Sequence, residues 1–289
     1  IELVGTNAAG DALHISAGGS TVRGLAINRF PGFPVLLTDA GGNRVQCSLI
    51  GTDPAGTLDL GNGAGITIGS DDNLIGADGD GDDDDREGNL ISGSGEWGVF
   101  IEGTNRRNRV SGNRIGTNAD GSAALANSTY GVYINEASEN VVGTNGDGIG
   151  DAFEGNLISG NGWAGVHLSH PAAQANRVSG NRIGTNALGT AAIPNGGWGI
   201  LMHTGGNFVG TNGDGISDEL EGNLISGNAS YGILLSNFEA QANRISGNRI
   251  GTDALGTAAI PNGGSGIVIT SQANYNLVGT NGDGVADED

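Results

Sequence analysis

Four loops of this chain carry oxygen-bearing side chains at a spacing that suits a calcium ion. In the loop from Gly143 to Glu154 such side chains occupy the third, fifth, ninth and twelfth positions, and a glycine occupies the sixth. Twelve-residue calcium loops place ligands at these positions, because Ca²⁺ takes about six to eight hard oxygens and the glycine permits a sharp bend. Ca²⁺ is therefore the cofactor that the sequence predicts.

The same pattern begins again at Gly76, Gly210 and Gly279. The first position, which is ordinarily Asp, is Gly in every copy, and no flanking helices are expected, so these loops are not EF-hands. The alternative is that the acidic residues only keep exposed loops soluble. The predicted metal ligands are Asp78, Asp80, Asp84, Glu87, Asn145, Asp147, Asp151, Glu154, Asn212, Asp214, Asp218, Glu221, Asn281, Asp283 and Asp287.

Four aromatic residues form a second candidate binding feature. Trp97, Tyr130, Trp198 and Tyr231 each precede a glycine that opens a short apolar segment. In other copies of this segment the place is taken by Ala64, Ala164 or Ser265, so the aromatic column is expected to be broken. Aromatic faces aligned along a surface can stack on sugars, and glycans are the ligands that this feature suggests. Packing of the rings on adjacent loops is the alternative.

No residue is predicted to be catalytic. A polysaccharide lyase would need acids and a basic residue on one face, and a hydrolase would need a pair of carboxylates. Acids and arginines are abundant, yet each candidate returns in every repeat, whereas a catalytic centre is usually singular. His167 and His203 align with other residue types in neighbouring copies, and both are expected at outward surface positions.

An internal repeat of the chain positions these residues. The segment Gly-Asn-Leu-Ile-Ser-Gly begins at Gly88, Gly155 and Gly222, and each copy starts 67 residues after the previous one. Every unit divides into two unequal turns, and each turn holds three short apolar-alternating segments. No helical period is present. This pattern predicts a parallel β-solenoid in which stacked turns create the core.

The repeat places valine, isoleucine and asparagine in columns. Val45, Ile75, Val110 and their equivalents are predicted to stack inside one face, and Ile91, Ile115 and Ile158 inside another. An asparagine at the same corner of each turn can bond to the asparagines above and below it. We expect two such ladders, at Asn43, Asn73, Asn108, Asn140, Asn176, Asn207, Asn243 and Asn276, and at Asn89, Asn113, Asn156, Asn181, Asn223 and Asn248.

The predicted fold is all-β: a right-handed parallel β-helix with three short strands per turn and about nine turns. Residues 1–289 are expected to form a single domain. Residues 1–42 would make irregular N-terminal turns. The segments that begin at Leu13, Thr21 and Val35 still fit strands, but Pro31 and Pro34 favour an irregular edge or loop there. Residues 43–289 would make regular repeat turns that stop mid-repeat, so the chain is predicted to be part of a longer array or a subunit that stacks end to end on neighbouring copies.

The motif Asn-x-Ile-x-Gly-Asn followed by Gly-Ile-x-Ile resembles the right-handed parallel β-helix repeats of the pectate-lyase-like superfamily. With Asn181-Arg182-Ile183-Gly184-Thr185 and its copies, the chain is most similar to repeat arrays of large secreted or surface-attached bacterial proteins. The resemblance covers nearly the whole chain. It implies a structural or adhesive rod on the cell surface or outside the cell, and a polysaccharide-acting lyase or hydrolase, or a glycan-binding β-helix, as the alternatives.

Charge and composition limit the kinds of molecule that the chain can bind. The formal net charge is −20, and all 12 basic residues are arginine. Such a surface repels nucleic acid and anionic membranes and favours cations. No apolar run approaches the roughly 18 residues that a membrane span needs, so membrane insertion by this segment is not expected. Cys47 is the only cysteine, which excludes an internal disulfide.

Overall fold

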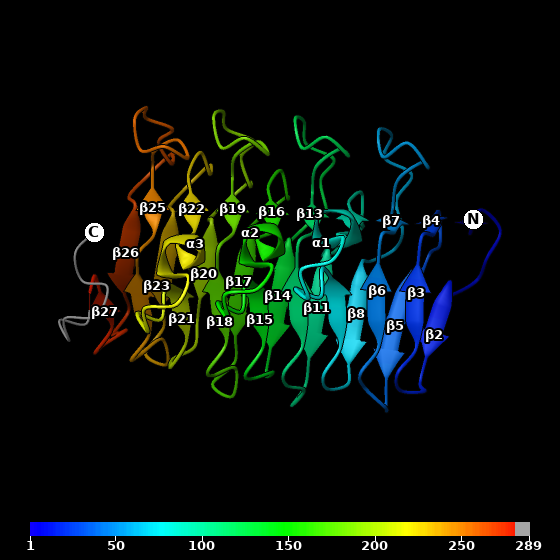
Figure 1. The fold of residues 1–289 in the computed structure, drawn as a ribbon, viewed down its shortest axis with the longest axis horizontal. Coiled ribbons are helices and arrows are strands. Elements are labelled where there is room, and N and C mark those ends of the chain that lie inside the picture. Colours follow the sequence, from blue (N-terminus) through cyan, green and yellow to red (C-terminus); the bar gives the residue numbers. More distant parts are fainter. Residues whose placement is uncertain (281–289) are drawn as a thin grey trace.

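The strands of this chain form three parallel sheets that wind around one core as a right-handed parallel β-helix (Figure 1). The computed structural model describes residues 1–280. Each sheet contains nine strands, and each strand pairs with the equivalent strands one turn before and one turn after it. Each turn thus gives one strand to each sheet, which confirms the predicted fold class.

All strands are short, with two to four residues each. Sheet A contains β1 (Glu2–Val4), β4 (Ala26–Asn28), β7 (Leu49–Ile50), β10 (Leu90–Ile91), β13 (Arg114–Ile115), β16 (Leu157–Ile158), β19 (Arg182–Ile183), β22 (Leu224–Ile225) and β25 (Arg249–Ile250). Sheet B contains β2 (Leu13–Ile15), β5 (Val35–Thr38), β8 (Ile66–Gly69), β11 (Val99–Glu102), β14 (Val132–Asn135), β17 (Val166–Ser169), β20 (Ile200–Met202), β23 (Ile233–Ser236) and β26 (Ile267–Thr270). Sheet C contains β3 (Thr21–Arg23), β6 (Arg44–Gln46), β9 (Leu74–Gly76), β12 (Arg109–Ser111), β15 (Val141–Gly143), β18 (Arg177–Ser179), β21 (Phe208–Gly210), β24 (Arg244–Ser246) and β27 (Leu277–Val278).

Three single helical turns interrupt the solenoid, each inside one acidic loop: α1 (Asp84–Glu87), α2 (Asp151–Glu154) and α3 (Asp218–Glu221). Within residues 1–280, none of the helices has the length and apolar character that a membrane crossing requires. The helical turns were not expected from the sequence, because four residues are too few to show a helical period.

The core is the interior of the solenoid, filled by the predicted aliphatic columns. Val110 pairs with Ile75 on one side and Val142 on the other, and all three side chains are inaccessible to solvent. Ile91 and Ile115 stack in the same way in sheet A. One continuous cluster of buried side chains follows the rod. Since no single turn could bury its apolar face alone, stability comes from stacking.

The turns built from residues 1–42 are more regular than the sequence predicts. Strands β1 to β5 lie in this segment and join the same three sheets in register, as in the pairing of Leu13 with Val35. Pro31 and Pro34 lie in the connection between β4 and β5. Outside a strand, a proline removes no ladder hydrogen bond, so both residues are accommodated without disturbing the sheets.

Asparagine ladders hold the corners of the turns. Asn156 accepts hydrogen bonds from the backbone N and the side-chain Nδ2 of Asn113, at 2.9 and 3.0 Å, and donates to Oδ1 of Asn181 at 2.9 Å. Its Nδ2 also donates to the carbonyl oxygen of Val110 at 2.7 Å. Both predicted ladders are present. A third, not anticipated, precedes sheet B and runs through Asn127, Asn161, Asn195, Asn228 and Asn262.

Two kinds of insertion alternate along the rod. The acidic loops connect sheet C to sheet A in one turn, and hairpin-like arms connect sheet A to sheet B in the next. Successive turns are about 4.8 Å apart, whereas a helical turn with its side chains is about 10 Å wide, so an acidic loop does not fit in every turn. The acidic loops therefore recur in every second turn.

The arms contact one another and cover part of sheet A. Their ridge follows one edge of the molecule (Figure 1). The backbone N of Ala187 donates to the carbonyl oxygen of Gly121 in the preceding arm at 3.0 Å, and Ala254 repeats this bond with Gly189 at 2.9 Å. Gly121 lies so close to Leu157 that a side chain there would collide with the leucine, which is buried although it points outward.

We expect Asn156→Ala to lower the free energy of unfolding by at least about 2 kcal/mol, because it leaves the buried backbone amide of Asn113 without its acceptor and breaks the ladder on both sides. Urea unfolding measures the loss, and hydrogen exchange at the Asn113 amide localises it. Asn274→Ala, at an exposed asparagine of the same rod, is the matched control and should leave both unchanged. Equal behaviour of the two variants would contradict the ladder.

Candidate functional site

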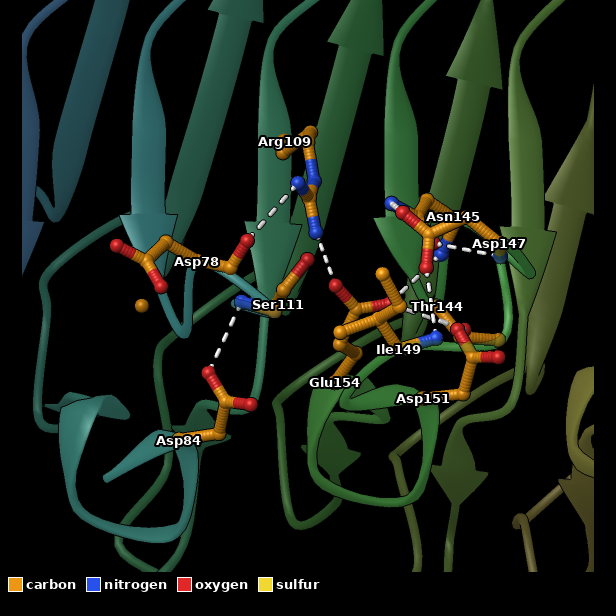
Figure 2. Close-up of polar contacts among 12 residues, drawn as sticks. Asp78, Asp84, Arg109, Ser111, Thr144, Asn145, Asp147, Ile149, Asp151 and Glu154 are labelled. Atoms are coloured by element: carbon orange, nitrogen blue, oxygen red, sulfur yellow. Dashed lines mark hydrogen bonds and ion pairs between the residues drawn. The ribbon is translucent and has the colours of Figure 1, made fainter. Parts of the chain in front are cut away.

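Each acidic loop is closed by the aspartate that begins its helical turn (Figure 2). Asp84 accepts hydrogen bonds from the backbone N of Gly79 and of Gly81, both at 3.0 Å. Asp151 accepts from the backbone N of Gly148 at 2.8 Å and from the Thr144 hydroxyl at 2.7 Å. Asp218 repeats these bonds in the third loop. These carboxylates therefore shape their own loops.

The glutamate that ends each helical turn is buried and pairs with an arginine. Glu154 and Glu221 are fully inaccessible to solvent. Oε1 of Glu154 meets Nη2 of Arg109, and Oε1 of Glu221 meets Nη2 of Arg177. Glu87 pairs with Arg23 at 3.0 Å. Each glutamate also accepts from a backbone N of its own loop, as Glu154 does from Asn145 at 2.9 Å.

The arginines link consecutive acidic loops into one ridge. Arg109 projects from β12, the strand between β9 and β15, from which the first and second loops depart. Its Nη1 donates to the carbonyl oxygen of Asp78 in the first loop at 3.2 Å, while its Nη2 pairs with Glu154 in the second (Figure 2). Arg177 joins Asn145 to Glu221 in the same manner. The bridge therefore recurs with each unit.

Burial and hydrogen bonding shift the pKa values of these acids. Burial raises the pKa of Glu154, and the Asn145 amide and the charge of Arg109 offset this only in part. Burial likewise raises the pKa of Glu221. Burial also acts to raise the pKa of Asp151, but hydrogen bonds from Ser217, Thr144 and the loop amides outweigh it and lower the pKa. The aspartate charge is thus stabilised by the loops themselves.

Within residues 1–280, the first loop alone brings three carboxylates together. Oxygens of Asp78, Asp80 and Asp84 all lie within 4.8 Å of one another. Asp78 also pairs with Arg44, and its Oδ1 is buried without a hydrogen-bond partner among the described residues. The second and third loops have Asn145 and Asn212 in place of Asp78.

The remaining predicted ligands are arranged differently. Asn145 and Asp147 bond to each other at 2.8 Å, as do Asn212 and Asp214 at 2.9 Å. Glu87, Glu154 and Glu221, predicted at the twelfth ligand position, are engaged by arginines and loop amides. Asn281, Asp283 and Asp287 lie outside the described residues.

The predicted aromatic residues gather on the outer face of sheet B. Trp97 packs on Phe100 with ring centroids 4.5 Å apart, and Tyr130 packs on Tyr133 at 5.0 Å. Trp198 and Tyr231 pack against the buried side chains of Ala164, Leu201 and Leu234. The rings thus cover the outward row of the sheet, rather than loops alone.

The column is continuous where the sequence predicted a gap. Trp163, one residue before Ala164, lies between Tyr130 and Trp198, with ring centroids 5.4 and 5.7 Å away. Its side chain is 45% exposed. Sequence reasoning missed Trp163, Phe100 and Tyr133. The signal was available, because the outward positions of sheet B hold aromatic residues where a solvated face would be polar. We call Trp97, Tyr130, Trp163, Trp198 and Tyr231 the aromatic strip.

A single acid–arginine cluster of the kind a lyase needs is not found among residues 1–280. An open groove runs beside α2 and α3. Its lining includes Asp151, Asp218, Arg182 and Arg249. These are two pairs of repeat-related residues, whereas Glu219, which also lines the groove, stands where the preceding unit has Ala152.

No protein-family model matches the chain, and no curated protein matches it. Among solved structures, the chain is similar to a mutant of the periplasmic alginate epimerase AlgG, with a TM-score of 0.34 and 11% sequence identity. The similarity covers 93% of this chain and 46% of that one, so this chain spans less than half of the epimerase's length. The comparison bears on the β-helix fold alone.

We expect Glu154→Gln to lower the free energy of unfolding by about 2–3 kcal/mol, because it leaves Arg109 partly buried without its counter-charge. The substitution keeps the shape of the side chain. Urea unfolding is the measurement. Glu96→Gln makes the same chemical change at an exposed glutamate and should cost nothing measurable. If the two variants unfold alike, the bridge does not stabilise the ridge.

Proposed function

We propose that this chain is a rigid structural segment of a secreted or cell-surface rod. One observation carries the proposal: each element that protrudes from the solenoid is tied to its equivalent in the next unit. Arg109 and Arg177 tie acidic loop to acidic loop. Backbone bonds tie arm to arm. A binding or catalytic loop is ordinarily free to vary, whereas here the protrusions add stiffness along the axis.

The first acidic loop is the proposed calcium site of this rod. Asp78, Asp80 and Asp84 each place a carboxylate oxygen within 4.8 Å of the others, which is close enough for all three to ligate one ion. Carboxylate oxygens are the ligands that Ca²⁺ prefers. Loops that rely on few carboxylates bind it weakly, with dissociation constants of about 10⁻⁴–10⁻³ M, which suits an extracellular setting.

Calcium at about 5 mM is expected to stabilise the protein by about 1–2 kcal/mol, and so to raise its melting temperature by a few degrees. Asp80→Asn removes one ligand charge at an exposed residue and should abolish most of the rise. Asp85→Asn removes the same charge outside the cluster and should retain it. Differential scanning calorimetry with CaCl₂ and with MgCl₂ makes the comparison. Absence of a shift in the unaltered protein would refute the site.

The aromatic strip supports a second candidate function, the binding of a linear, non-acidic glycan along the rod. The favouring observation is that five successive turns each carry one ring, and that Tyr130, Trp163 and Trp198 contact one another in sequence across the place of Ala164. Exposed aromatic rings stack on the apolar faces of sugars. The net charge of −20 disfavours acidic polysaccharides.

All three tryptophans of the chain belong to the strip, so their fluorescence reports on it directly. Titration with cellohexaose or a chitosan oligomer is expected to change the emission, whereas polygalacturonate should not. Trp163→Ala should weaken binding at least tenfold. Tyr275→Ala, at an aromatic residue that is exposed elsewhere, is the control. A glycan that binds both variants equally would exclude the strip as its site.

A further inference from the structure

One pair of residues breaks the repeat with a chemistry that no other turn carries. His167 lies in β17 where the equivalent residues one unit away are Phe100 and Leu234. His203 follows β20 where the next unit has Thr270. Because the acidic loops and the asparagine ladders recur with each unit, a departure from the repeat is a place where a specific function is expected.

The fold brings the two histidines together although 36 residues separate them. Strands β17 and β20 are neighbours in sheet B, and the backbone N of His203 donates to the carbonyl oxygen of Leu168 at 2.9 Å, which continues the ladder past the end of β20. Both side chains therefore project from the outer face of the sheet. Nε2 of His167 lies 3.4 Å from Nδ1 of His203. The ring centroids are 5.2 Å apart and the rings are perpendicular.

His167 packs as an aromatic ring, stacked on Tyr133 with ring centroids 4.9 Å apart, although a leucine fills the same place in the next unit. His167 is only 6% exposed, and its Nδ1, which is not the nitrogen that faces His203, is buried without a partner among the described residues. A buried polar atom without a hydrogen bond costs stability, and the leucine of the next unit would avoid that cost. A contact of 3.4 Å between two rings is a long hydrogen bond, and it offsets little of this cost.

We propose that His167 and His203 form a binding site for a divalent transition-metal ion such as Zn²⁺, Ni²⁺ or Cu²⁺. Two nitrogens that each lie about 2.0–2.1 Å from one tetrahedral ion are about 3.3–3.4 Å apart, which is the separation of Nε2 and Nδ1 here. Ring centres about 1.1 Å behind such nitrogens are then about 5.2 Å apart, again as in this structure. The two imidazoles are thus arranged to share one ion with little rearrangement.

The chemistry of the pair selects among metals. Imidazole nitrogen suits Zn²⁺, Ni²⁺ and Cu²⁺, whereas Ca²⁺ and Mg²⁺ require oxygen ligands. Burial lowers the pKa of His167 to about 3 and lowers that of His203, so both rings are neutral at pH 7, the form that binds metals. Two protein ligands leave the remaining positions to water. Cu²⁺ should bind more tightly than Ni²⁺ or Zn²⁺.

The repeat itself supplies variants that keep the fold. His167→Leu and His203→Thr each install the residue that the next unit carries at the same place, so both should fold. His203→Thr should retain the melting temperature of the unaltered protein, and His167→Leu, which removes the unpartnered Nδ1, should retain or raise it. Isothermal titration of tag-free protein with ZnCl₂, in 5 mM CaCl₂ to saturate the acidic loops, is expected to reveal one site. Either substitution should weaken it at least tenfold, and the double variant should lose it.

Two further histidines are the matched controls. His14 bonds to Thr38, and His170 pairs with Glu136, so neither belongs to the pair. His14→Ala and His170→Ala should leave Zn²⁺ affinity unchanged. The EPR spectrum of the Cu²⁺ complex should show coupling to two imidazole nitrogens and change in His203→Thr. The proposal fails if Zn²⁺ does not bind, or if binding survives both pair variants with the fold intact. Neither result affects the proposed rod or its calcium site.

Discussion

The spacing between turns is the constraint on which this structure depends. Parallel strands stack about 4.8 Å apart. A side chain or loop that leaves the solenoid must be narrower than this spacing, or it must be absent from the next turn. Acidic loops and arms therefore alternate, at different corners, and each faces its own equivalent two turns away. In sheet C, a strand that carries an arginine lies between each two strands from which acidic loops depart. Arg109 and Arg177 use that position to bridge loops that could not otherwise touch.

The same spacing explains the asparagine content. At a corner the backbone leaves one strand before it enters the next, so its amides have no partner in a sheet. The side-chain oxygen of an asparagine reaches the equivalent asparagine one turn away. There it accepts hydrogen bonds from both the backbone amide and the side-chain amide, as Asn156 does for Asn113. Three ladders of this kind hold the three corners. Stability is therefore distributed along the rod, with each turn depending on its neighbours.

Two faces of the rod carry different kinds of side chain. Along the row of acidic loops, most of the carboxylates that were predicted to bind metal instead accept hydrogen bonds from loop amides or pair with arginines. Among the loops that the structure describes, the first alone keeps three carboxylates in one place, because Asp78 stands where later loops have asparagine. On the outer face of sheet B, aromatic rings form a second apolar layer. Within that layer the pair His167 and His203 is the departure from repetition, and this makes it the most specific chemistry on the rod.

The sequence by itself determined the fold, because the period of 67 residues and the alternation of Val and Ile require that each turn bury its apolar face against the next. It also determined two asparagine ladders, whose members keep their place through the insertions. It did not determine which acids meet, since the partner of Glu154 is an arginine 45 residues earlier on another strand. Nor did it place Trp163 in the aromatic strip, or Nε2 of His167 beside Nδ1 of His203. Those contacts depend on the direction of side chains across neighbouring turns, and only the tertiary structure decided them.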